Sequence, residues 1–122
     1  MDSRRFEQLV AQAIDNLPDE IHERLENVDI VVADNPTRDQ LRHLKGRRGE
    51  MLLGLYEGVP LTERTHGYGL VMPDKITVFQ RPIEAVCRND TQVIAEIQRV
   101  VRHEIAHHFG ISDDRLEELG RY

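Results

Sequence analysis

Two histidines and a glutamate near the C-terminal end of the chain have the spacing of a metal-activated hydrolase. His103, Glu104 and His107 form the pattern H-E-x-x-H. Histidines four residues apart lie on the same face of a helix, about one turn apart, so both imidazoles can bind one metal ion. The glutamate faces the same space without being placed as a ligand, and it can take a proton from metal-bound water. The pattern therefore predicts metal-assisted hydrolysis.

The residues after the second histidine extend the pattern to H-E-x-x-H-x-x-G-x-x-D. Gly110 lets the chain leave the helix in a left-handed turn, and Asp113 can then turn back as a third ligand. Three protein ligands with an open fourth position are typical of catalytic zinc. We predict that His103, His107 and Asp113 bind Zn²⁺ and that Glu104 is the catalytic base, taking a proton from the water and passing it to the leaving amine.

A long helix must carry these residues. It is predicted over residues 89–109, opening on the capping residues Asn89, Asp90 and Thr91. His103 and His107 lie at the margin of its apolar arc, whereas Glu104 and His108 fall inside it. A buried ionised glutamate is costly without a partner, and a nearby dication would account for its position. His108 is predicted first as a hydrogen-bonded core histidine, then as a support for the metal site and last as a ligand. The apolar arc consists of Val93, Ile94, Ile97, Val100, Val101 and Ile105.

The rest of the chain predicts a small scaffold. Apolar periodicity indicates helices at residues 4–16 and 18–25 and strands at 28–33, 51–56 and 75–80, with a loop at 62–74. The basic segment 35–50 is interpreted as a solvated helix and loop, with an anion or partner contact as the alternative. Together these elements predict one α+β domain over residues 1–122. Its helices pack on a small mixed sheet of three to four strands, and the metal site lies on the long helix of the C-terminal half.

The motif resembles that of the zincin metallopeptidases with a glycine turn, and the chain from about Leu52 onward is similar to the minimal zincin-like metallopeptidases. Residues 56–64 and 77–84 and the ending after Asp113 carry this second resemblance. It implies a zincin-like fold, zinc and a peptide or protein substrate. It also implies that an edge strand beside the active helix binds substrate backbone, for which residues 75–80 are the candidate. The chain departs from the larger metzincin group, because no methionine follows Asp113.

Composition limits the possible partners and compartment. The net charge is −6, which disfavours nucleic-acid binding. The single Cys87 excludes an internal disulfide and is interpreted as a small buried hydrophobe rather than a nucleophile. Without a signal-like or membrane-spanning apolar run, the protein is predicted to be cytoplasmic and not membrane-bound. Few aromatic residues and no Trp predict an aliphatic core.

Two other functions stay open at this point. One is a zinc endoribonuclease, since an RNA-processing family also places ligands at i, i+4 and i+10, although that family lacks the glutamate found here as Glu104. The other is a non-catalytic partner-binding module stabilised by its metal. Several further residues are weaker candidates for the site, and each is interpreted instead as a solvated or surface residue or left unassigned: His22, His43, His66, Tyr68, Glu96 and Tyr122.

Overall fold

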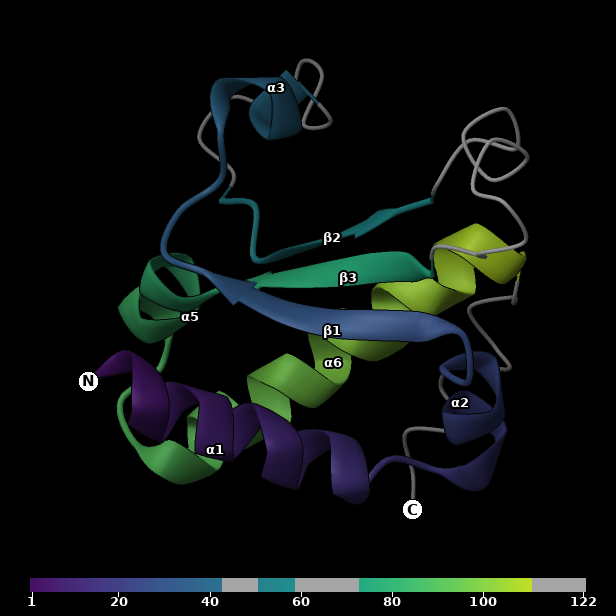
Figure 1. Cartoon of the computed structure of the whole chain (residues 1–122). Coiled ribbons are helices and arrows are strands. Elements are labelled where there is room, and N and C mark those ends of the chain that lie inside the picture. The colour runs from purple at the N-terminus through teal and green to yellow at the C-terminus, as the bar shows by residue number, and fades with distance from the viewer. Residues whose placement is uncertain (43–50, 59–72, 111–122) are drawn as a thin grey trace.

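The computed structural model describes residues 1–42, 51–58 and 73–110 of the chain. Within these ranges the protein is an α+β structure with five helices and one three-stranded mixed sheet (Figure 1), as predicted. The helices are α1 (Ser3–Asp15), α2 (Asp19–Arg24), α3 (Arg38–Leu41), α5 (Gln80–Val86) and α6 (Asp90–Phe109). The strands are β1 (Val28–Ala33), β2 (Gly54–Glu57) and β3 (Asp74–Phe79).

The sheet has the order β1-β3-β2, so β3 is its central strand. It pairs with β1 in parallel and with β2 in antiparallel orientation. The prediction that residues 75–80 form the substrate-binding edge is therefore wrong, because both sides of β3 are taken up by ladder hydrogen bonds. Among the described strands, β1 and β2 are the outer ones, and β2 is the one that packs closely on α6.

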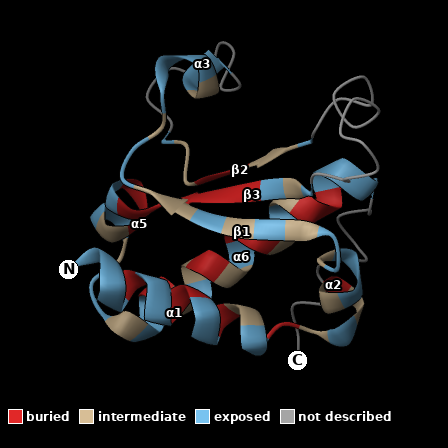
Figure 2. Cartoon of the chain, viewed as in Figure 1, coloured by how far each residue is buried: buried red, intermediate tan, exposed pale blue. Residues whose placement is uncertain are grey.

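The two long helices α1 and α6 cover one face of the sheet, and the core lies between them and the strands (Figures 1 and 2). The residues that α1 and α6 bury repeat at helical spacing, which is the apolar arc predicted for each helix. As predicted, the core is mainly aliphatic. It is formed by Phe6, Leu9, Val10, Ala13, Leu17, Ile21, Ile76, Val78, Ile83, Val93, Ile97, Val101 and Ile105.

Local capping fixes the ends of the helices. The Asp2 carboxylate accepts from Arg5 N (2.8 Å) at the start of α1, and the Asn89 side chain accepts from Gln92 N (2.9 Å) at the start of α6. Gly110 ends α6 with φ 68° and ψ 29°, the left-handed turn predicted for it. The helix predicted at 18–25 begins one residue later than expected, because Pro18 is the N-cap of α2 and not its first helical residue.

Two elements differ from the sequence prediction. The strand predicted at 51–56 is the shorter and later β2, and Gln80, predicted to end the third strand, instead begins the helix α5, which was not predicted. Pro82 lies in the first turn of α5, where the missing N–H costs no helical hydrogen bond.

The basic segment predicted as a solvated helix and loop contains α3. Its Thr37 and Gln40 form a capping box, and α3 buries none of its residues. The Gln40 amide donates to the Glu57 carboxylate (3.0 Å), which ties α3 to the end of β2. Residues 43–50 of this segment, and most of the loop predicted at 62–74, lie outside the described residues. No helix in the described ranges has the length and apolar character needed to cross a bilayer.

Candidate metal centre

Three residues spaced four apart on one side of α6, Val100, Glu104 and His108, each contact strand β2. Val100 packs beneath Gly54, where a Cβ would stand only 2.3 Å from Val100 Cγ1. One turn later Glu104 reaches the backbone of Tyr56, and one further turn along His108 stacks on the Tyr56 ring. The close approach of α6 to β2 at Gly54 therefore determines which residues of the next two turns of α6 contact Tyr56.

His103 and His107 lie on the exposed face of α6 with their ring centroids 5.1 Å apart and their planes inclined by 50°. Two nitrogens bound at about 2.0–2.1 Å to one tetrahedral zinc ion are separated by about 3.4 Å. Because each ring nitrogen stands off its ring centre, nitrogens on facing edges of these rings can reach that separation. The two imidazoles thus fit a pair of ligands to one zinc ion.

Glu104 is half-buried, and its Oε1 accepts a hydrogen bond from the backbone N–H of Tyr56 at 2.9 Å. From the sequence, its position inside the apolar arc was explained by a nearby dication. The structure adds a second partner, the peptide group of β2, which offsets the cost of removing a carboxylate from water. The bond also holds the carboxylate against the backbone of the outer strand β2.

The third predicted ligand, Asp113, lies outside the described residues, as does Asp114. The described part of the chain contains no group of three His, Cys, Asp or Glu side chains placed to hold a metal. The structure therefore places His103 beside His107 and bonds Glu104 to β2, and the role of Glu104 and the ligand role of Asp113 stay predictions. Gly110 supplies the left-handed turn through which the chain leaves α6 toward that residue.

Comparison with known proteins identifies the family and the fold. The family model described as zincin-like metallopeptidase matches residues 25–121, most of the chain. The chain belongs to this family. Zinc binding is general to the zincin-like family. In this chain the histidine pair lies on α6, the long helix that capping and periodicity predicted.

A solved structure has a similar fold. A conserved hypothetical protein from Thermus thermophilus is 20% identical in sequence, with a TM-score of 0.55 over 89% of this chain and 94% of that one. At this level of identity the likeness concerns the fold alone. Comparison with curated proteins gives no significant match.

Tyr56 and Asp74 form a second cluster beside Glu104 that was not predicted from the sequence. The Tyr56 hydroxyl donates to Asp74 Oδ2 (2.7 Å), and His108 stacks on the Tyr56 ring with 3.9 Å between centroids. His108 Nε2 lies 4.0 Å from Asp74 Oδ2. Tyr56 is thus the common contact of Glu104, Asp74 and His108. The only sequence signal was the position of Tyr56 within the stretch 56–64 that resembles the family.

His108 is not the core histidine that was predicted. Its side chain is 40% exposed, and Phe109 next to it meets its ring edge to face, with centroids 4.8 Å apart. Phe109 in turn lies beneath the guanidinium of Arg24 in α2, 5.0 Å from ring centroid to Cζ. The last turn of α6 is therefore held by aromatic contacts at its surface, not by burial of His108.

Other candidate residues take ordinary structural roles or lie outside the described ranges. Glu96 pairs with Arg99, whose Nε donates to Glu96 Oε1 at 3.0 Å, as predicted for a helix residue next to arginine. His22 is a half-buried residue of α2. The remaining candidates fall outside the described residues: His43, His66, Tyr68 and Tyr122.

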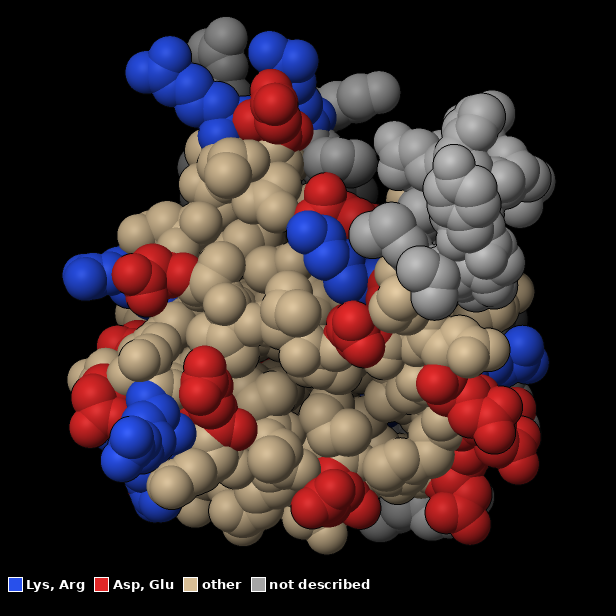
Figure 3. Space-filling view, in the orientation of Figure 1, with Lys and Arg blue, Asp and Glu red and all other residues tan. Residues whose placement is uncertain are grey.

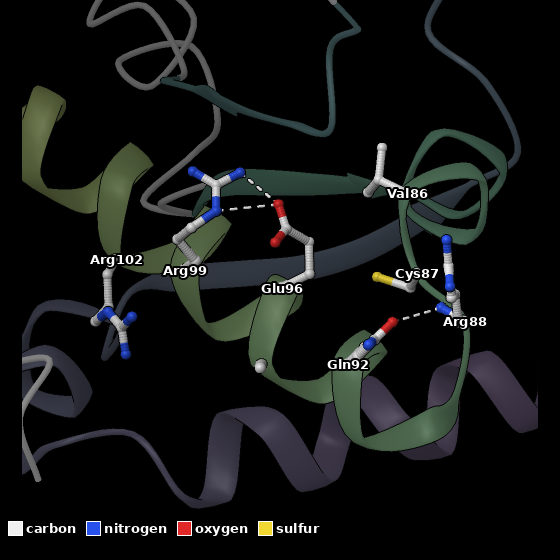
Figure 4. Close-up of a pocket in the computed structure, with 8 residues that line it drawn as sticks. Val86, Cys87, Arg88, Gln92, Glu96, Arg99 and Arg102 are labelled. Atoms are coloured by element: carbon white, nitrogen blue, oxygen red, sulfur yellow. Dashed lines mark hydrogen bonds and ion pairs between the residues drawn. The ribbon is translucent and has the colours of Figure 1, made fainter.

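A hollow of about 500 Å³ lies between the end of α5 and the outer face of α6 (Figure 4). Cys87 stands in its wall, with its half-buried side chain packed against the core. Burial, and then the carboxylate of Glu96, raise the pKa of the Cys87 thiol above its usual range. A thiol that stays protonated is a poor nucleophile, which agrees with the interpretation of Cys87 as a small hydrophobe. The lining of this hollow does not include His103, Glu104 or His107.

Proposed function

We propose that this protein is a zinc-dependent metallopeptidase that hydrolyses a peptide bond, with Glu104 as the general base. The observation that carries the proposal is a pair of exposed imidazoles 5.1 Å apart on α6, where the residue next to His103 is a glutamate that bonds to the outer strand β2. Membership of the zincin-like metallopeptidase family supports it. The proposal treats the chain as an enzyme acting on a peptide or protein substrate in the cytoplasm.

His103, His107 and the predicted third ligand Asp113 would hold the zinc. When bound, zinc supplies Lewis acidity, which lowers the pKa of a coordinated water to about 7 and polarises a carbonyl oxygen. Two neutral imidazoles and one carboxylate are a ligand set that zinc accepts in catalytic sites. Both histidines are exposed, so the pair is open to solvent and substrate on the described side.

Glu104 has the position and chemistry of the general base. Its carboxylate takes the proton of the attacking water and gives it to the amine of the leaving peptide fragment. One oxygen, Oε1, accepts from Tyr56 N–H, and this bond orients the carboxylate relative to the histidine face. A base held by a backbone donor needs less reorganisation to act, which is the advantage of a preorganised site.

The substrate backbone is proposed to lie along β2 rather than β3. The Phe79 N–H donates to the Leu53 carbonyl (3.0 Å), so Leu53 and every second residue after it direct their backbone groups toward β3. Gly54 and Tyr56 then direct theirs outward, and the bond from Tyr56 N–H to Glu104 agrees with this alternation. A substrate carbonyl that accepts from Tyr56 N–H would release the Glu104 carboxylate for proton transfer.

The test is a fluorogenic peptide library incubated with zinc-loaded protein, with and without chelator, beside the Glu104→Gln variant. We expect the variant to keep its fold and about one Zn²⁺ per chain, because a glutamine oxygen still accepts from Tyr56 N–H. Hydrolysis should fall by about 10²–10⁴-fold, the usual contribution of a general base. A matched His103→Ala variant should lose zinc as well as activity. Glu104→Gln protein that hydrolyses the best peptide at the wild-type rate would overturn the proposed mechanism.

The same experiment separates the two other functions. A labelled single-stranded RNA is incubated beside the peptides, and chelator-sensitive cleavage of RNA alone would identify an endoribonuclease. Zinc that raises the melting temperature while neither substrate is cleaved would identify a metal-stabilised binding module, since a ligand bound only by the folded state stabilises it by mass action. Zinc-supplemented protein that contains no zinc and melts unchanged in chelator contradicts the metal site itself.

A further inference from the structure

A groove of about 690 Å³ runs between helix α1 and the outer strand β1, away from the histidine pair. Ala11 is exposed at the centre of its helical wall, where its short side chain leaves space beside the strand. Val10 and Ile14 of α1 and Ile30 and Val32 of β1 complete an apolar lining. The middle of the groove is thus apolar and open to solvent, with a strand along one side.

Strand β1 offers backbone groups on this side. Its partner in the described sheet is β3 alone, so the alternate N–H and C=O groups of β1 that do not face β3 point toward the groove side of the sheet. The burial of β1 is also that of an outer strand, since Asp29 and Val31 are exposed while the residues between them are half-buried. An extended segment can add to such an edge by main-chain hydrogen bonds.

Two carboxylates mark the ends of the groove. Glu7 and Asp15 are exposed residues of its lining and lie eight positions apart on α1, with Ala11 midway between them. Figure 3 shows this face as largely uncharged surface, with acidic side chains at its border and Lys or Arg side chains next to some of them. Eight residues of helix span about 12 Å. Four residues of an extended strand span about 13 Å.

These two lengths match, and they fix the side-chain pattern of a bound strand. In an extended segment residues i, i+2 and i+4 face the same side. With i and i+4 opposite Glu7 and Asp15, residue i+2 lies over Ala11, where the wall is apolar and recessed. Basic side chains at i and i+4 and an apolar one at i+2 are therefore complementary to the groove.

We propose that the α1–β1 groove binds an extended basic peptide segment with the pattern [Lys/Arg]-x-apolar-x-[Lys/Arg], added as a fourth strand beside β1. A second copy of this chain is a poorer occupant. It would bring its own Glu7 and Asp15 to the same contact, on a chain whose net charge is already −6. The site is separate from the proposed peptidase centre, since its lining does not include the residues of α6 that carry the motif.

The test is fluorescence anisotropy with a labelled peptide containing Lys-Thr-Val-Thr-Lys, titrated with Glu104→Gln protein so that the proposed hydrolysis is suppressed. The control peptide contains Lys-Thr-Val-Lys-Thr, which has the same composition and charge but turns one lysine to the other face. We expect the first peptide to bind at least about tenfold more tightly, and its affinity to fall with added salt. Equal binding of the two peptides would overturn the proposed spacing.

A second experiment reverses the charges that line the groove. The double change Glu7→Lys and Asp15→Lys should weaken binding of the lysine peptide by about tenfold or more and should confer binding of a Glu-Thr-Val-Thr-Glu peptide. The control, Glu23→Lys with Glu26→Lys, makes the same charge change at exposed positions outside the groove and should leave both affinities within about twofold. Equal losses in the two double variants would show a general charge effect and refute the site.

The main-chain contact is tested on the peptide, so it does not depend on the folding of any variant. N-methylation of one set of alternate peptide nitrogens should abolish binding, whereas methylation of the other set should spare it. Alternate amides of Val28–Ala33 should become protected from hydrogen exchange when the peptide is bound. Insensitivity to both methylations, or a peptide-free dimer in which these amides are already protected, would overturn the proposal, the latter in favour of a second copy.

Discussion

Gly54 is the residue at which helix α6 comes closest to strand β2, and Gly54→Ala is the sharpest test of how that contact is built. An added Cβ would stand 2.3 Å from Val100 Cγ1 and 3.2 Å from the carbonyl oxygen of Thr77. Carbon atoms in contact are normally about 3.5–4.0 Å apart, so at least about 1.2 Å must be gained. Val100 is β-branched and has one favoured rotamer in a helix, so the helix itself must move.

The expected cost follows from that movement. Overpacking a close-packed site typically costs about 1–3 kcal/mol, and we expect Gly54→Ala to lower the free energy of unfolding by an amount in this range. Val100→Ala alone should cost about 2 kcal/mol, because it removes two buried methyl groups and leaves a small cavity. In the double variant the main clash is gone, so its stability should be close to that of Val100→Ala alone. The 3.2 Å contact with the Thr77 carbonyl persists, so the relief should be incomplete.

The measurement is urea unfolding followed by circular dichroism, on all four proteins of the double-mutant cycle. Gly58→Ala is the matched control, since among the described residues the nearest atoms to a Cβ there belong to the Asp74 carboxylate, at 3.6 Å or more, which is an ordinary contact. We expect that control to stay within about 0.5 kcal/mol of wild type. A Gly54→Ala protein as stable as wild type, or additive losses in the double variant, would refute direct packing of Val100 against the backbone of β2.

Three further changes test other parts of the molecule. Asp113→Ala should weaken zinc affinity by orders of magnitude in a zinc titration. Asp114→Ala should keep the metal and cost about 1 kcal/mol, because Asp114 and Glu117 have the spacing of a capping box and the sequence predicts that Asp114 caps a terminal helix. Tyr56→Phe removes the hydroxyl donor to Asp74 and should cost about 1 kcal/mol in urea unfolding, with the ring contact retained. Because burial raises the pKa of Cys87, its alkylation by iodoacetamide should stay slow at neutral pH and accelerate only above the usual thiol range; rapid labelling at pH 7 would contradict this.

Features that depend on residues within a few positions of one another were predicted correctly from the sequence. The start and end of α6 follow from the Asn89 cap and the Gly110 turn, both contacts within a few residues, and both were placed correctly. The pairing of His103 with His107 is likewise a property of one helical turn. The ligand role of Asp113 rests on the motif alone and stays a prediction.

Strand order and the surroundings of the site depend on distant residues and were not predicted. The buried run Ile76 to Phe79 differs from the alternation in β1, and a strand buried on both faces is typical of the middle of a sheet. The residue types do not carry that difference, because the outer strand β1 (VDIVVA) contains fewer polar residues than the central strand β3 (DKITVF). His108 was wrongly predicted to be buried. A helical wheel shows which side of the helix a residue faces, but it does not show whether the sheet extends far enough to cover that residue. Tyr56 reaches Glu104 across 48 residues, a contact that no local pattern encodes.

The parallel pairing of β1 with β3 affects the order in which the chain can fold as it is synthesised. Each residue of β1 lies opposite one 46 positions later, as Val28 lies opposite Asp74, whereas β2 and β3 pair across no more than 24 positions. The docking of helix α1 requires even more of the chain, because Arg5 bonds to Asp90 and Gln98 bonds to Ala13, each across 85 positions. The N-terminal third is therefore the first part made and the last to dock. Until then the apolar face of α1 is exposed to other chains in a crowded cell, a hazard that comes from topology and not from low stability of the finished fold.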